Sequence, residues 1–110
     1  MHLHPHAEQL IITAIGGHRG KRRHRHAPLL VLTQQELLTP LLALLVVAAD
    51  SEPVDIMTLG LCELHFTVDG KPVPAIPYLG HGSLRLPCGD YAVEHPDALR
   101  DWFSERGLET

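Results

Sequence analysis

The side chains best suited to contact a ligand are concentrated in one short segment, residues 16–28, which reads GGHRGKRRHRHAP. Guanidinium and ammonium groups at this density neutralise phosphates and release counterions, which supplies the sequence-independent part of nucleic-acid affinity. The segment lacks aromatic side chains on which single-stranded bases would stack, and no nucleic-acid-binding motif surrounds it. We therefore expect this basic segment to be a mobile inter-strand loop that contacts nucleic acid or a nucleoprotein complex. The alternative is a flexible, solvated connection without a ligand, or one that lies on the protein's own acidic surface. The residues expected to make the contact are Arg19, Lys21, Arg22, Arg23 and Arg25.

The rest of the chain is acidic, with four basic residues against thirteen acidic ones. The net charge of −4 therefore divides into +5 in the basic segment and −9 in the remainder. This division supports an alternative function, that of a protein-binding inhibitor or immunity-type protein whose acidic body blocks a basic, nucleic-acid-binding partner. The acids are densest from Asp90 onward, and those expected to face such a partner are Asp97, Asp101, Glu105 and Glu109.

Histidines form a second group with the chemistry to bind a ligand. His2, His4 and His6 alternate, so an extended chain would place them on one side, and imidazole is a common metal ligand. No cysteine or carboxylate lies among them, and His24 and His26 stand beside arginines that would repel a cation. We therefore expect adventitious chelation only, with no functional metal site and no cofactor.

The two cysteines are the remaining nucleophiles. Cys62 shares its strand parity with apolar residues, which favours burial, whereas Cys88 lies in a Pro-Cys-Gly turn and is expected to be exposed. Nothing at a known spacing supplies an activating base, and an enzyme would have to combine Cys88 with His81 or His95. The sequence therefore predicts a binding protein without catalytic residues.

Composition and length are those of an ordinary globular chain. With 110 residues, 45% hydrophobic and 20% charged, the protein is expected to form one domain, 1–110, with a frayed start over 1–7. Two cysteines fit a reducing compartment, and the apolar run 41–49 is too short to span a membrane. With no signal peptide visible, we expect a soluble, cytoplasmic protein.

Two apolar strands and a helix are expected to hold the basic segment. Residues 10–15 and 29–32 read as strands, the first of them covered on both faces, and the connection between them is long for a hairpin. The next helix begins either with a Thr33–Glu36 capping box or with Thr39 and Pro40, and it runs through residue 49. Because it is apolar nearly all round, it is expected in the core or at a homodimer contact.

The clearest β signal is a hairpin over residues 62–75 with Asp-Gly at its turn. A two-residue loop pairs Val68 with Lys71, Phe66 with Val73 and Leu64 with Ala75. The prolines at 72 and 74 mark the second strand as a sheet edge. Glu63 and His65 share the outward face of the first strand, where we expect an ordinary polar surface rather than an acid/base pair.

The chain ends with two short strands, 83–86 and 91–94, and a helix over 96–106 capped by Gly107. The apolar face expected on this helix consists of Ala98, Leu99, Trp102 and Phe103. The order of elements predicts an α+β fold, with a small, mostly antiparallel sheet, an apolar central helix and a C-terminal amphipathic helix.

Overall fold

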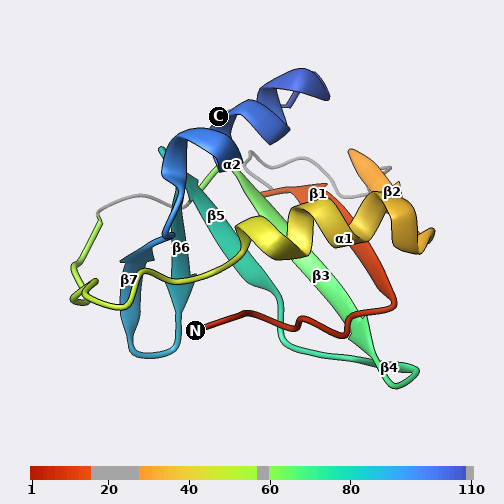
Figure 1. The fold of residues 1–110 in the computed structure, drawn as a ribbon, viewed down its shortest axis with the longest axis horizontal. Helices are drawn as coiled ribbons and strands as arrows, with labels where there is room; N and C mark the ends of the chain where they lie inside the picture. The colour runs from red at the N-terminus through yellow and green to blue at the C-terminus, as the bar shows by residue number, and fades with distance from the viewer. Residues whose placement is uncertain (16–27, 57–59, 109–110) are drawn as a thin grey trace, which may run out of the picture.

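The computed structural model describes residues 1–15, 28–56 and 60–108, which form a seven-stranded antiparallel sheet and two helices (Figure 1). The predicted α+β class is confirmed. The strands run in the order β2-β1-β3-β5-β6-β7, and β4 pairs with β3 beside this path. The strands are β1 (Gln9–Ala14), β2 (Leu30–Leu32), β3 (Cys62–Val68), β4 (Lys71–Pro72), β5 (Ile76–Gly80), β6 (Ser83–Leu86) and β7 (Gly89–Ala92), and the helices are α1 (Gln35–Leu44) and α2 (Pro96–Glu105).

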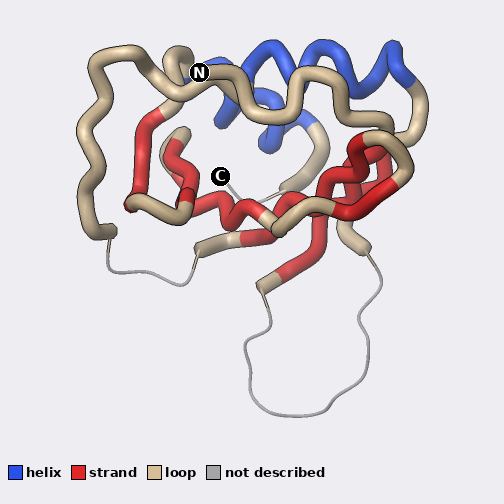
Figure 2. Tube along the Cα trace, turned by 90° about the horizontal axis from the view of Figure 1, so that it is seen from below, coloured by secondary structure: helices blue, strands red, loops and turns tan. Residues whose placement is uncertain are grey.

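Both helices lie on the same face of the sheet, and the core fills the space between the two layers (Figure 2). Side chains alternate between the two faces of each strand, so every second residue points toward the helices and contributes to this core. Leu10 and Ile12 of β1 are fully buried in this way, whereas Ile11 and Thr13 on the opposite face are only half-buried. The prediction that this strand is covered on both faces is therefore wrong, because neither helix lies over the second face.

Helix α1 differs from its prediction at both ends. Gln34 precedes it as the N-cap without a side-chain cap hydrogen bond, so the Thr33–Glu36 capping box does not form. Pro40 lies inside the helix, which rules out the alternative start at that residue. The helix ends at Leu44 rather than at residue 49, because the backbone of residues 45–47 pairs with other segments.

Those partners include the start of the chain, which is anchored rather than frayed. The N–H of Leu3 donates to the carbonyl of Leu45 at 3.0 Å, and the N–H of Val47 donates to the carbonyl of Met1 at 2.9 Å. Leu3 and Ala7 are buried in the core. Residues 45–47 continue the apolar pattern of the helix, but they form a short extended stretch that is hydrogen-bonded to the N-terminus.

The hairpin after β3 follows its predicted register only near the turn. Val68 pairs with Lys71 as expected, but Leu64 pairs with Ile76 instead of with Ala75. The shift of one residue places Ile76 and Tyr78 on the core face, where both are buried. β4 is an edge as predicted, whereas the chain beyond it forms β5, which lies inside the sheet between β3 and β6.

The last three elements are close to their predictions. β6 and β7 form a hairpin with a turn at Pro87 and Cys88, so β7 begins two residues earlier than expected. α2 ends in a Schellman motif, in which Gly107 has φ +75° and the N–H of Leu108 donates to the carbonyl of Phe103 at 3.0 Å. Leu99, Trp102 and Phe103 are buried, but Ala98 is exposed and does not belong to the apolar face.

Candidate functional site

The basic side chains predicted to bind nucleic acid lie outside the described residues. What the structure shows is how the sheet is built around their segment. β1 and β2, which flank it, pair directly through Ile12 and Leu30, and the N–H of Leu29 donates to the carbonyl of Ile12 at 2.7 Å. The two strands therefore form a paired hairpin stem, and the segment between them is far longer than the two to five residues that such a hairpin needs. Arg19, Lys21, Arg22, Arg23 and Arg25 all belong to that segment.

The acidic residues of the alternative function are brought together on the exposed side of α2. Asp97, Asp101 and Glu105 are spaced four residues apart, so they follow one another along one face of the helix. All three are exposed, Asp97 to 92% of its side chain. Arg100 lies 3.4 Å from Asp97 and Arg106 lies 3.7 Å from Glu105, so the stripe is partly neutralised at both ends. The fourth predicted residue, Glu109, lies outside the described part of the chain.

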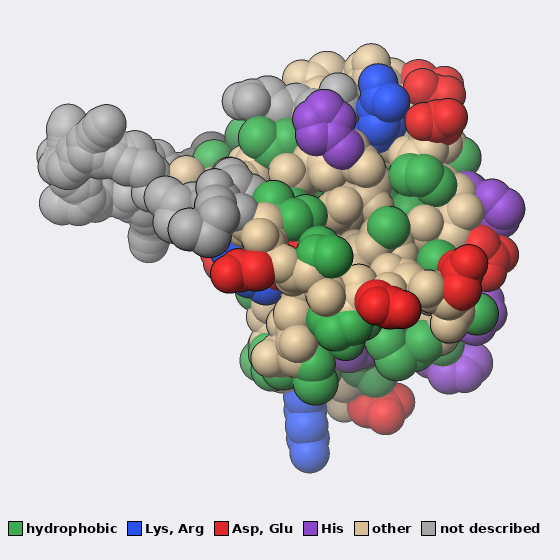
Figure 3. All heavy atoms as spheres, turned by 90° about the vertical axis from the view of Figure 1, so that its left-hand side faces the viewer, with side chains coloured by type: hydrophobic (Ala, Val, Ile, Leu, Met, Phe, Trp, Pro, Cys, Tyr) green, Lys and Arg blue, Asp and Glu red, His purple; other side chains and the backbone are tan. Residues whose placement is uncertain are grey.

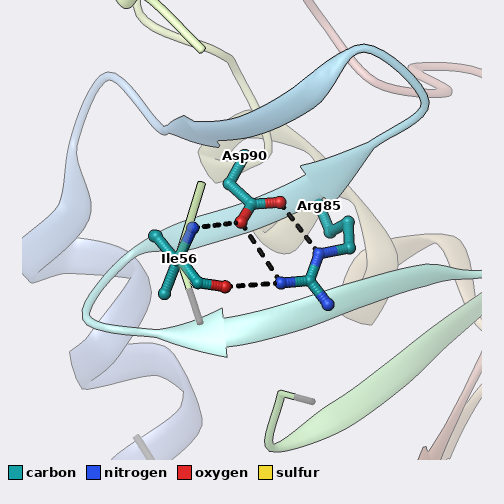
Figure 4. Close-up of polar contacts among 3 residues, drawn as sticks. All are labelled: Ile56, Arg85 and Asp90. Atoms are coloured by element: carbon teal, nitrogen blue, oxygen red, sulfur yellow. Dashed lines mark hydrogen bonds and ion pairs between the residues drawn. The ribbon is translucent and has the colours of Figure 1, made fainter. Parts of the chain in front are cut away.

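The most completely built polar site in the described structure joins Arg85 and Asp90 (Figure 4). The two residues face each other across the β6–β7 hairpin, and the Asp90 carboxylate accepts hydrogen bonds from Arg85 Nε at 2.9 Å and Nη2 at 3.2 Å. The N–H of Ile56 donates to the same carboxylate at 2.8 Å, and Arg85 Nη2 donates to the carbonyl of Ile56 at 2.8 Å. The backbone N–H and the backbone C=O of Ile56 are thus both hydrogen-bonded to the same ion pair.

This ion pair fastens segment 54–56 to the edge of β7. Val54 and Asp90 exchange two backbone hydrogen bonds of 3.0 Å, next to the side-chain contacts made by Ile56. Hydrogen bonding to Arg85 is the main reason why the pKa of Asp90 lies below its ordinary value. Sequence reasoning missed this pair, although a turn at residues 87–88 would have placed Arg85 opposite Asp90 and so revealed it.

A shallow hollow of about 600 Å³ lies between segment 53–55 and the β6–β7 turn. Arg85 contributes to its lining together with Asp55 and Asp90, so two carboxylates offset the single guanidinium and disfavour an anion there. Cys88 lies at the turn and is exposed, as predicted, whereas Cys62 is buried; the two cysteines do not form a disulfide. We therefore read the Arg85–Asp90 pair as a structural clamp rather than as a ligand site.

The side of the molecule formed by β7 and the 50–56 segment shows how the acidic charge is distributed (Figure 3). Acidic side chains are spread over this side in separate places, with apolar side chains between them. On α2, by contrast, three exposed acidic side chains follow one another along one face of the helix. A basic partner would therefore find its best-defined contact on α2.

Glu63 and His65 lie on the sheet face away from the helices, together with Thr13. Thr13 Oγ1 is 3.0 Å from His65 Nε2, and Glu63 Oε1 is 3.7 Å from the same nitrogen. A relay from hydroxyl to imidazole to carboxylate would need the two oxygens on different ring nitrogens. Because both oxygens face Nε2, the arrangement is a cross-strand polar contact and not an acid/base relay.

The N-terminal histidines do not share one side as an extended chain would have placed them. His4 has φ +47° and packs its ring against Phe66 at 5.2 Å, while His2 pairs its backbone with Val46. Within the described residues, no group of three or more His, Cys, Asp or Glu side chains is arranged to hold a metal ion.

No family model, curated protein or solved structure matches this chain. Its function therefore has to follow from its own charge distribution and geometry. In the described part of the chain, no helix has the length and apolar character needed to cross a membrane.

Proposed function

We propose that this protein is a non-enzymatic binding module that contacts nucleic acid or a nucleoprotein complex through its basic segment. The observation that carries the proposal is the placement of five positive charges in a connection between two strands that already pair with each other. Paired antiparallel strands are usually joined by two to five residues, so the pairing of β1 with β2 does not itself call for a connection of this length. Long insertions of this kind between paired strands are commonly functional.

Phosphate contacts are the interaction that this charge supplies. The sheet face of β1, β2 and β3 that turns away from the helices carries no Phe, Tyr or Trp in the described residues. This face therefore offers no aromatic ring, within the described residues, on which an unpaired base could stack. Binding is expected to depend steeply on salt and little on base sequence, because phosphate contacts carry no sequence information.

The test is to neutralise two charges in the segment by Arg22→Gln and Arg23→Gln and to measure affinity for a short DNA duplex as a function of salt. The logarithm of the binding constant falls with the logarithm of the salt concentration, by about 0.9 for each phosphate contact. Loss of two contacts should therefore make this negative slope shallower by about 1.8. The matched control is Lys71→Gln with Arg100→Gln, which removes the same charge elsewhere on the surface.

The control variant should bind with the slope of the parent protein. Equal slopes in the parent and in the Arg22 and Arg23 variant would contradict the proposal. So would the absence of duplex or RNA binding by the parent at low salt. Unfolding midpoints of all three proteins show whether a lost slope reflects lost structure.

We place the protein in the cytoplasm. Its two cysteines do not form a disulfide, since Cys62 lies in the core and Cys88 at an exposed turn. An exposed free thiol persists most readily in a reducing compartment.

An alternative function is supported by the acidic face of α2, on which Asp97, Asp101 and Glu105 are aligned and exposed. In this case the protein would bind a basic protein and block its nucleic-acid-binding surface. Deletion of residues 18–26 separates the two functions, because it should leave capture of a basic protein intact and abolish nucleic-acid binding. Asp97→Asn with Asp101→Asn should have the opposite effect.

A further inference from the structure

Strand β2 is the outermost strand of the sheet within the described residues. It pairs with β1 on one side, and no other strand of the described structure pairs with it. A strand in an antiparallel sheet directs its N–H and C=O groups in alternate pairs to either side. The outer side of β2 therefore offers backbone donors and acceptors to a further strand.

The opposite edge of the sheet is protected, which makes the exposure of β2 specific. Val54 forms a bridge with Asp90 of β7, and Val47 forms a bridge with Val93 just beyond it. The Arg85–Asp90 pair fixes this protection through Ile56. Among the described residues, the edge at β7 is therefore paired with another segment, whereas the outer side of β2 is not.

The side chains at β2 favour association with an apolar strand. Among the described residues, five large hydrophobic side chains are exposed, and two of them lie in or directly before β2: Leu29 (46%) and Val31 (48%). Residues 29–32 contain none of the charges, prolines or bulges that usually prevent edge-to-edge pairing. The neighbouring residues 33–35 are also uncharged.

A second copy of this chain fits the edge best. If two β2 strands pair antiparallel about Val31, Leu30 of each copy lies opposite Leu32 of the other, so an apolar strand meets an identical one. The chain carries a net charge of −4, yet the contact is uncharged, so the copies do not repel each other there.

We propose that β2 is a self-association edge through which two copies pair antiparallel, with Val31 on the two-fold axis. The contact joins two seven-stranded sheets into one continuous sheet. It is isologous, because the same residues serve on both sides. A ladder of three residues buries little area, so the dimer is a weak, reversible one. This contact replaces the homodimer expected through residues 41–49, whose side chains Leu41, Leu42 and Leu45 are buried in the chain's own core.

A disulfide placed on the two-fold axis tests the geometry directly. Residues directly opposite in an antiparallel pair have Cα atoms about 4.5–5.5 Å apart, within the range of roughly 4.4–6.8 Å that a disulfide spans. Val31→Cys, in a Cys88→Ser background, should therefore form a covalent dimer on mild oxidation. The matched control is Val54→Cys in the same background, because Val54 is equally apolar and 56% exposed but lies at the protected edge.

Sedimentation of the unmodified chain without nucleic acid provides the second measurement. The parent and Val31→Ile should both show a weight-average mass that rises with concentration, whereas Val31→Lys should remain monomeric with an unchanged unfolding midpoint. The proposal is overturned if the parent stays monomeric up to about 1 mM, or if both cysteine variants cross-link equally. It is also overturned if the parent is monomeric and binds an added extended peptide that Val31→Lys no longer binds. The edge would then accept a foreign strand and not a second copy of the chain. Because no nucleic acid is present, none of these results bears on the proposed function.

Discussion

Gly82 lies where the β5–β6 turn meets the start of α2. Its φ of +74° is in the left-handed region, and a Cβ atom built there would lie 2.4 Å from Cβ and 2.6 Å from Cα of Pro96. Pro96 is the first residue of the helix, so its backbone cannot move without shifting α2. The N–H of Gly82 also donates to the buried hydroxyl of Tyr78 at 3.2 Å. Alanine at this position therefore faces both a strained backbone and an occupied space.

The two costs can be separated because Gly70 has the same backbone conformation without the contact. Its φ is +75°, and a Cβ there would meet nothing within 4 Å. Gly70→Ala should cost only the left-handed conformation, about 1 kcal/mol. Gly82→Ala should cost this and a further amount for overpacking, about 1–3 kcal/mol. The expected total for Gly82→Ala is about 2–4 kcal/mol.

Urea unfolding followed by fluorescence measures this difference. Trp102 is the only tryptophan in the chain and is 5% exposed, so its emission should report loss of the α2 packing. With a typical m-value of about 1–3 kcal/mol/M, the midpoint of Gly82→Ala should fall about 1 M below that of Gly70→Ala. Equal midpoints for the two variants would refute the argument, because they would mean that the Gly82–Pro96 contact does not constrain the fold.

Two further predictions concern the clamp and the thiols. Because the pKa of Asp90 is lowered in the folded protein, its carboxylate stabilises the fold above the ordinary pKa of 3.8, and this contribution is lost as the pH falls further. Asp90→Asn should lower stability at pH 7, make the loss on acidification smaller, and speed hydrogen exchange at the N–H of Ile56; an unchanged exchange rate would contradict the clamp. Cys88 should react with iodoacetamide in the native protein, whereas Cys62 should react only after unfolding, which peptide mapping can distinguish.

Local patterns in the sequence were sufficient wherever a segment forms a regular element on its own. Apolar alternation located β3, and Pro96 and Gly107 marked the two ends of α2. These signals depend on residues within one or two turns of each other, so they survive in the folded chain. The strong charge contrast between the basic segment and the acidic remainder is likewise a property of the sequence alone.

The tertiary structure decided what depends on pairing between distant residues. The apolar run after Leu44 leaves the helix because its backbone bonds to the N-terminus and to Glu94. Ile76 takes the place of Ala75 opposite Leu64 because this register buries the larger side chain. The same applies to the sheet edges: the sequence does not indicate which strands lie at an edge, and only the folded chain shows that Val54 pairs with β7 while, among the described residues, β2 has a strand on one side only. Each of these contacts forms between segments far apart in the sequence, and several segments compete for the same partner. A local sequence pattern does not show which of the competing pairings is the more stable.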